Sequence, residues 1–152
     1  MQVTCYMGLF TCITRAWLTI DNLIFFWNYE DGSDISFYDS LTEAILSVEL
    51  FKPSVGTFDE GIEYGLCLAT NSTVVLLSID FIRFTKGNGA IVNEMKFSPQ
   101  PVYQIPTENS IINTIKSSKT SGRLFMGAKD GCLYEFSYQV IKFFIENSKK
   151  IY

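Results

Sequence analysis

Few side chains of this chain could carry out catalysis or bind a metal. The 152-residue sequence has no histidine, which removes imidazole as a general base, a metal ligand and a pH switch. Its four cysteines form no C-x-x-C pair, so a structural zinc site is not predicted; they are Cys5, Cys12, Cys67 and Cys132. Because Cys67 and Cys132 lie in apolar runs, we expect buried, reduced thiols there. We therefore expect no enzyme activity, no cofactor, no metal and no small-molecule substrate.

Oxygen-rich and glycine-rich stretches offer two further chemical alternatives. The cluster of Asp31, Asp34 and Asp39 suggests calcium, but Gly32 stands where a calcium loop needs a ligand and the glutamate of the twelfth position is missing. Solvated turn carboxylates are the favoured interpretation. Gly87-Asn88-Gly89 lacks the flanking residues of a phosphate-binding loop, so it predicts a turn.

Two short motifs could be modified covalently. Asn71-Ser72-Thr73 matches the acceptor of N-glycosylation, and Ser98-Pro99 could accept a proline-directed phosphate. The first lies between two apolar runs, where a hairpin turn is the favoured interpretation, and the second is favoured as a proline-initiated turn.

Charge and hydropathy limit the possible partners. The chain carries 12 Lys and Arg against 16 Asp and Glu, a net charge of −4, and no dense basic stripe that could neutralise phosphates. Direct nucleic-acid binding is therefore not expected. No apolar run approaches the roughly 18 residues of a membrane-spanning helix, and Met1–Thr14 is a poor signal peptide, so we expect a soluble intracellular protein.

The elements that position these residues recur as hairpins. In each, an apolar run meets a short polar turn and a second apolar run follows, which is the pattern of two antiparallel strands. The three predicted hairpins are Trp17–Trp27, Leu66–Leu77 and Leu124–Phe136. Further strands are predicted at Ile35–Tyr38, Ala44–Phe51, Val102–Ile105 and Ile111–Lys116, with Phe81–Phe84 extending the sheet before a turn at Lys86–Gly89. A helical turn at Leu41–Ile45 is the alternative for the start of the second of these strands.

The spacing of the hairpins predicts a β-propeller. Their first residues are separated by 49 and 58 residues, and a four-stranded blade uses about 40–50. About ten or eleven strands make two and a half to three blades, whereas roughly four to eight close a ring. We therefore predict an all-β fold: a partial propeller at 15–139, an N-terminal strand or extension at 1–14, and a tail at 140–152 that forms either a short helix or a strand. A fragment, a truncated product and a divergent paralogue are all compatible with this count.

The first and third hairpins carry a family resemblance. The stretch Arg15–Gly32, which includes RAWLTIDN and FWNYEDG, resembles the amino-terminal β-propeller of the large inner-ring scaffold nucleoporins, a family without FG repeats. The stretch Gly122–Glu135, GRLFMGAKDGCLYE, is similar to the same propeller. Two shorter stretches are similar in the same order: Glu43–Pro53 and Pro101–Asn109. Between them Phe81–Met95 matches poorly, as expected of a variable loop.

The resemblance implies a structural constituent of the nuclear pore complex, located in the nucleus at the nuclear envelope, that supports transport of protein and RNA. Other scaffold nucleoporins are the implied partners; the nuclear-envelope membrane surface is a weaker expectation, resting on an aromatic face with flanking lysines at Val140–Ile151. A β-propeller adaptor of another trafficking or coat complex is the alternative.

Aromatic side chains are the candidate interaction residues. In a propeller we expect most of them to pack between neighbouring blades, while the rest form a surface for a partner, because aromatic residues are enriched in interface cores. The candidates are Trp17, Phe26, Trp27, Tyr29 and Tyr134.

Overall fold

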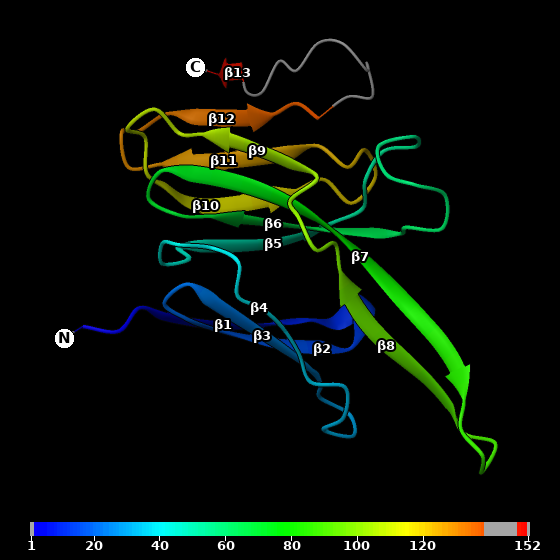
Figure 1. Ribbon diagram of the computed structural model, residues 1–152. Helices are drawn as coiled ribbons and strands as arrows, with labels where there is room; N and C mark the ends of the chain where they lie inside the picture. The colour runs from blue at the N-terminus through cyan, green and yellow to red at the C-terminus, as the bar shows by residue number, and fades with distance from the viewer. Residues whose placement is uncertain (1, 139–148, 152) are drawn as a thin grey trace.

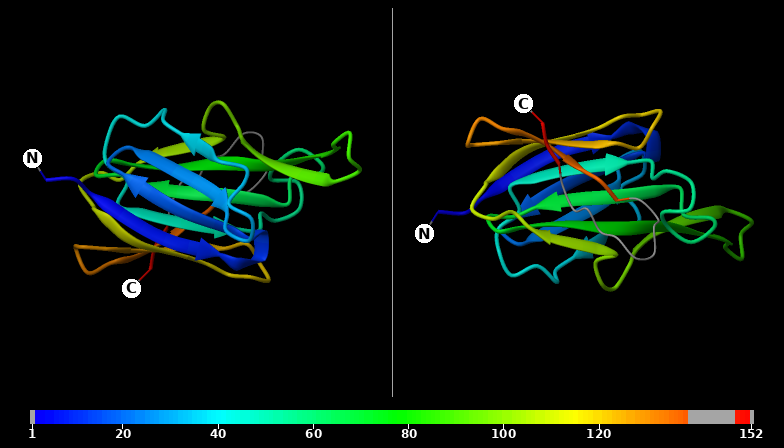
Figure 2. Two further views of the ribbon diagram at one scale, coloured as in Figure 1. Left: turned by 90° about the horizontal axis from the view of Figure 1, so that it is seen from below. Right: turned by 90° about the horizontal axis from the view of Figure 1, so that it is seen from above.

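The structure, a computed structural model, describes residues 2–138 and 149–151. Its strands form three antiparallel sheets, A, B and C, stacked face to face with sheet B in the middle (Figures 1 and 2). Each sheet is built like a propeller blade, and the described residues form an open stack of three. The prediction of an all-β partial propeller is confirmed, at three blades.

Sheet A contains the first predicted hairpin. Its order is β1 (Cys5–Phe10), β2 (Arg15–Ile20), β3 (Leu23–Asn28) and β4 (Ser36–Tyr38), and a single 3-10 turn, η1 (Thr11–Ile13), joins β1 to β2. The chain reverses between β2 and β3 at Asp21, whose φ of 50° is one that aspartate tolerates. The Asp21 Oδ1 accepts the N–H of Thr4 at 2.9 Å, which fixes the turn to the start of β1.

Sheet B contains the second predicted hairpin and one unusually long strand. Its strands are β5 (Ser47–Phe51), β6 (Tyr64–Ala69), β7 (Thr73–Thr85), β8 (Ile91–Phe97) and β9 (Tyr103–Pro106). The 13-residue β7 pairs with β6 on one edge. On its other edge it pairs first with β9 and then with β8. The far half of β7 therefore leaves the sheet together with β8 as a projecting hairpin (Figure 1).

Sheet C contains the third predicted hairpin. Its order is β10 (Ile112–Ser117), β11 (Leu124–Ala128), β12 (Leu133–Phe136) and β13 (Lys149–Ile151). Between β11 and β12 the chain turns through Gly131, whose φ of 81° favours glycine. The tail predicted at 140–152 contributes β13, which pairs with β12, and its other residues lie outside the described residues.

Two apolar clusters hold the stack together, one on each face of sheet B. Leu66 and Leu68 of β6 enter the cluster shared with sheet A, whereas Cys67 and Ala69 enter the cluster shared with sheet C. Alternate side chains of a strand point to opposite faces, so a strand buried on both faces reads as one continuous apolar run. This explains why the second hairpin has the most uniformly apolar sequence.

Two sequence predictions need correction. The strand predicted from Ala44 begins at Ser47, and the alternative helical turn before it does not form. The preceding backbone is used elsewhere: the Ile45 N–H donates to the Asp21 carbonyl at 2.8 Å. The expected variable loop at Phe81–Met95 is instead mostly strand, because the second half of β7 and β8 pair across it. The predicted extension at Phe81–Phe84 is confirmed within β7.

Candidate interaction surface

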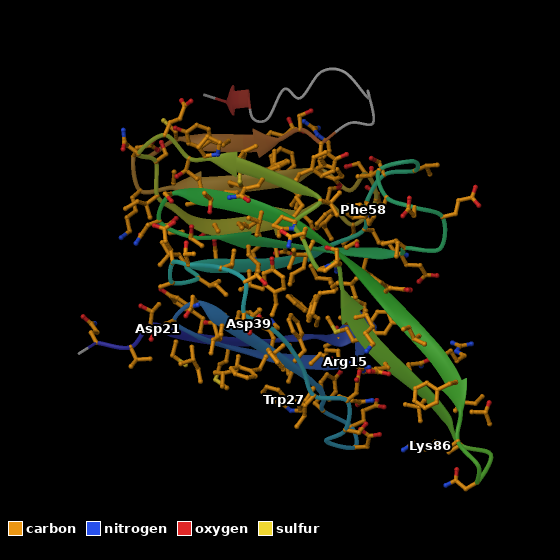
Figure 3. The ribbon with its side chains drawn as sticks, in the orientation of Figure 1. Arg15, Asp21, Trp27, Asp39, Phe58 and Lys86 are labelled. Carbon is orange, nitrogen blue, oxygen red and sulfur yellow. The ribbon has the colours of Figure 1, made fainter. Side chains whose placement is uncertain are left out.

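The face of sheet A that points away from sheet B is apolar across all four strands. Strand register places Met7, Leu18, Phe25 and Phe37 in one row across the sheet. The next row holds Leu9, Ala16 and Trp27. We call the following set the outer face of sheet A: Met7, Leu9, Leu18, Ile20, Phe25, Trp27 and Phe37. Figure 3 shows Trp27 on this side of the sheet.

Several side chains of the outer face are open to solvent. Met7 is 74% exposed, Leu9 61% and Phe37 58%. The Phe25 and Phe37 rings pack against each other with centroids 6.2 Å apart, so two of the aromatic side chains on this face form a contact pair. Contiguous exposed apolar surface of this kind usually marks an interaction site.

The corresponding face of sheet C is different in chemistry. Arg123 forms a salt bridge with Glu135 at 2.6 Å, and its guanidinium lies over the Phe125 ring at 5.0 Å from the centroid. The Lys116 side chain shares this face, opposite Phe125. The stack therefore has one apolar and one mixed, charged outer face.

A buried ion pair joins sheet A to the projecting hairpin. Arg15 of β2 is 2% exposed, and its Nη2 lies 2.8 Å from the Oδ2 of Asp34. The same Nη2 donates to the Asn93 carbonyl at 3.1 Å, and Nη1 donates to the Ile13 carbonyl at 3.3 Å. Asp34 in turn accepts the Met95 N–H at 3.0 Å. Figure 3 shows Arg15 at this junction.

A second polar group lies at the end of sheet C. The Tyr134 hydroxyl donates to the Asp130 Oδ2 at 2.7 Å, and the Ser110 hydroxyl donates to the same oxygen at 2.9 Å. These hydrogen bonds, with one from the Cys132 N–H, lower the pKa of Asp130 to about 2. A hollow of about 610 Å³ beside them is floored by buried apolar residues such as Ile105 and Met126.

The structure does not bring the five predicted aromatics into one site. Phe26 is fully buried between sheets A and B, and its strand neighbour Trp17 shares that inner face, with an indole Nε1 that has no partner among the described residues. Trp27 lies on the outer face, Tyr29 is a partly exposed residue just after β3, and Tyr134 belongs to sheet C.

Sequence reasoning missed two parts of these surfaces. Met7 and Leu9 alternate with Tyr6 and Gly8 along β1, a period-two signal that a short strand alone makes weak. The ion pair of Arg15 with Asp34 could not be predicted from the sequence, because the two residues are separated along the chain and only the fold brings them together.

The turn at Asp31 and the buried thiol of Cys67 are as expected. Two expectations need correction: Asp34 is a buried ion-pair partner rather than a solvated turn carboxylate, because the fold brings Arg15 to it, and Cys132 is only partly buried, because it lies in the turn before β12. Asp31 accepts the Ser33 hydroxyl at 2.7 Å within its own turn. Within residues 2–138 and 149–151, no cluster of acidic or cysteine side chains could hold a metal ion. Burial raises the pKa of the Cys67 thiol, which makes it unreactive. None of the described helical segments has the length and apolar character needed to cross a membrane.

Comparison with known proteins places the chain among nucleoporins. A nucleoporin family model described as Nup133 N-terminal-like matches residues 1–142. The nuclear pore complex protein Nup154 of Drosophila melanogaster is 41% identical over 148 residues, covering 97% of this chain and 10% of that protein. A probable nucleoporin of Schizosaccharomyces pombe is 36% identical over 134 residues, covering 88% of this chain and 10% of that protein.

A solved structure has the same fold. The crystal structure of the Chaetomium thermophilum Nup170 NTD–Nup53 complex matches with a TM-score of 0.77 and 25% identity, over 99% of this chain and 21% of that chain. The present chain spans about 10% of the length of the curated relatives that it matches. Because the family model matches nearly the whole sequence, the chain belongs to the Nup133 N-terminal-like family of nucleoporins.

Proposed function

We propose that this chain is a structural component of the nuclear pore complex at the nuclear envelope, where it supports transport of protein and RNA and catalyses no reaction. Family membership is the observation that carries the proposal. Two chemical features support a non-catalytic role: the sequence has no histidine, and the buried Cys67 has a raised pKa. An adaptor of another trafficking or coat complex is less well supported, because the matching relatives are nucleoporins.

The proposed domain organisation follows the blades of the propeller. We assign 15–139 to the partial propeller, with 1–14 and 140–152 as extensions at its two ends. In this division β1 completes sheet A and β13 completes sheet C, so each extension adds an edge strand to a blade. Short edge strands of this kind are typical of propellers.

The outer face of sheet A is the proposed interaction surface, and a further β-sheet is the proposed occupant. Sheet B already covers the inner face of sheet A with a similar set of aromatic and aliphatic residues, so a second sheet would complete the same packing. Trp27 and Phe37 would be the aromatic anchors of the contact.

Other nucleoporins are the proposed protein partners. The Chaetomium thermophilum relative was crystallised as a complex with Nup53, which supports a nucleoporin partner for this chain as well. Contact with the nuclear-envelope membrane surface stays a prediction, because it rests on tail residues that mostly lie outside the described ones. We propose no role for nucleic acid or small molecules.

Localisation of a tagged chain tests the proposal. The 152-residue protein should give a punctate nuclear rim, and Phe37→Glu should disperse it, because a charge on the outer face opposes burial of that face. Thr114→Glu, a matched change on the exposed part of β10, should keep the rim. Circular dichroism must show both variants folded. A signal on cytoplasmic vesicles would support the adaptor alternative, and a rim unchanged by Phe37→Glu would contradict the proposed surface.

A further inference from the structure

The far half of β7 has one edge that no strand covers. β6 pairs with β7 only as far as Ile79, whereas β8 pairs with it from Ile79 to Thr85. The hairpin of β7 and β8 projects past the three sheets in Figures 1 and 2. We propose that this edge, Asp80–Thr85, binds an extended segment of a partner protein by β-strand addition.

The strand register shows which backbone groups are available. In an antiparallel ladder, successive residues direct their N–H and C=O groups to opposite edges. The Lys86 N–H bonds to the Ala90 carbonyl at 2.8 Å, and the Ser78 carbonyl accepts from the Ser98 N–H at 3.0 Å. Even-numbered residues of β7 therefore face β8.

Odd-numbered residues of β7 face the other way. The Thr73 carbonyl accepts from the Thr70 N–H at 2.9 Å on the side of β6. By the same alternation, Phe81, Arg83 and Thr85 direct their N–H and C=O groups towards that side, beyond the start of β6 at Tyr64. Among the residues that the structure describes, no strand or side chain bonds to these backbone groups.

The outer edge of β8, on the opposite side of the same hairpin, is partly covered by other residues of the chain. On β8, the residues facing away from β7 are odd-numbered by the same register. At Asn93 and Met95, three of these groups are bonded by sheet A and the loop before β4: Arg15 donates to the Asn93 carbonyl, Asp34 accepts the Met95 N–H, and the Ser36 hydroxyl donates to the Met95 carbonyl at 3.0 Å. The β8 edge is thus covered by side chains at Asn93 and Met95, whereas the β7 edge presents a row of donors and acceptors that no described residue covers.

The side chains around the open edge of β7 indicate which residue types a bound partner strand would carry. Ile82 and Phe84 are 44% and 43% exposed on one face of the hairpin. On the other face, Phe81 and Arg83 line a groove of about 1010 Å³, whose walls include Glu63 of the segment before β6. A bound strand would place aliphatic residues opposite Ile82 and Phe84 and an acidic residue opposite Arg83, because directly opposed side chains share a face and opposite charges attract.

The occupant we propose is a different protein rather than a second copy. A second copy would pair through its own odd-numbered residues, and none of those in this part of β7 is acidic, so it could not offer Arg83 an opposite charge. The two-fold register centred on Arg83 would in addition place two guanidinium groups directly opposite each other, and opposed like charges destabilise a strand pair. Strand addition uses the backbone for affinity and alternate side chains for specificity. It does not depend on the nuclear-pore role, so the two proposals can fail separately.

Amide hydrogen exchange of the purified 152-residue chain tests the edge directly. In the free protein, the amides of Ile82 and Phe84 should exchange slowly because they bond to β8, and those of Phe81, Arg83 and Thr85 should exchange fast. The probe is a short designed strand with valine opposite Ile82 and Phe84 and glutamate opposite Arg83. Adding it at saturation should slow the fast amides about tenfold or more while the slow ones change little.

Two matched variants separate backbone pairing from charge. Arg83→Pro removes the outward N–H and leaves the backbone bonds to β8 in place, so it should weaken probe binding about tenfold. Both variants at Arg83 lose its side-chain bond to Asn93, so that loss is common to them. Arg83→Gln keeps the N–H and should weaken binding about threefold or less. Fluorescence anisotropy of a labelled probe measures both.

Four results would overturn the proposal that a partner protein adds a strand at this edge. The first is slow exchange of Phe81 and Arg83 in the free monomer, and the second is self-association of the chain through the edge, seen by light scattering. The third is absence of binding at millimolar probe. The fourth is equal binding of a probe whose alternate amides are N-methylated, since that probe cannot donate to β7.

Discussion

Replacing Asp34 by asparagine isolates the charge of the buried ion pair. Asp34 has a φ of 53°, a left-handed conformation that asparagine adopts as readily as aspartate, so the backbone is not strained by the change. The asparagine oxygen can still accept the Met95 N–H, which the carboxylate now accepts at 3.0 Å. What is lost is the carboxylate charge 2.8 Å from a guanidinium in a site where the side chains are 3% and 8% exposed.

The expected loss of stability is large. Removing one partner of a buried ion pair typically costs about 3–5 kcal/mol, because the other charge stays buried without compensation. Arg15 would keep its bonds to the Asn93 and Ile13 carbonyls, so we expect the lower end, about 3 kcal/mol in the free energy of unfolding. The double variant Arg15→Met with Asp34→Asn should recover about 2 kcal/mol relative to the sum of the single changes.

Urea unfolding followed by tryptophan fluorescence measures all three variants, since Trp17 and Trp27 both lie in sheet A. Asp59→Asn in the exposed loop before β6 is the control and should leave the unfolding midpoint unchanged. Strict additivity of the two single changes, or an Asp34→Asn effect below about 0.5 kcal/mol, would refute the buried-pair reasoning.

Three further predictions concern separate parts of the stack. A Cβ on Gly8 would lie 2.7 Å from the Trp17 ring, so Gly8→Ala should destabilise the chain by about 1–3 kcal/mol in urea unfolding and shift the tryptophan emission. The native Cys67 thiol should resist a thiol reagent that labels the exposed cysteines at once, and it should react only after denaturation. Hydrogen bonds led by that from Tyr134 lower the pKa of Asp130 from 3.8 to about 2; this stabilisation is therefore present above about pH 4 and lost as the pH falls through about 2. An NMR titration of Asp130 should show the low midpoint, and Tyr134→Phe should raise it.

The sequence predicts those strands whose pairing partner is close by. Each of the three hairpins forms as expected, since a polar turn between two apolar runs determines both strands at once. In the projecting part of β7 and β8, only Phe81–Phe84 was predicted as strand. The rest of Phe81–Met95 was expected to be a variable loop because that stretch matches the resembled family poorly, and a poor family match does not show whether residues pair as strands.

The interaction surface was harder to predict than the fold. Phe25, Phe26 and Trp27 are consecutive aromatics, and only the register of β3 with β2 shows that Phe26 faces sheet B while its two neighbours face outward. A one-residue change in register would exchange those roles, so composition alone could not assign them. The Arg15–Asp34 pair depends on the path of the hairpin, which no local pattern encodes.

The two attachments between sheets A and B have a geometric consequence. At one end, the turn after β2 is bonded to the linker that leads into sheet B, through the Asn22 side chain and the Leu41 carbonyl at 2.8 Å. At the other end, Arg15 of β2 donates to the Asn93 carbonyl of β8, in the hairpin by which sheet B extends past the end of sheet A (Figure 1). Because the two sheets are attached at both ends, neither can rotate relative to the other in the plane of the sheets without breaking one of these hydrogen bonds. The crossing angle between the strands of these two blades is thereby fixed.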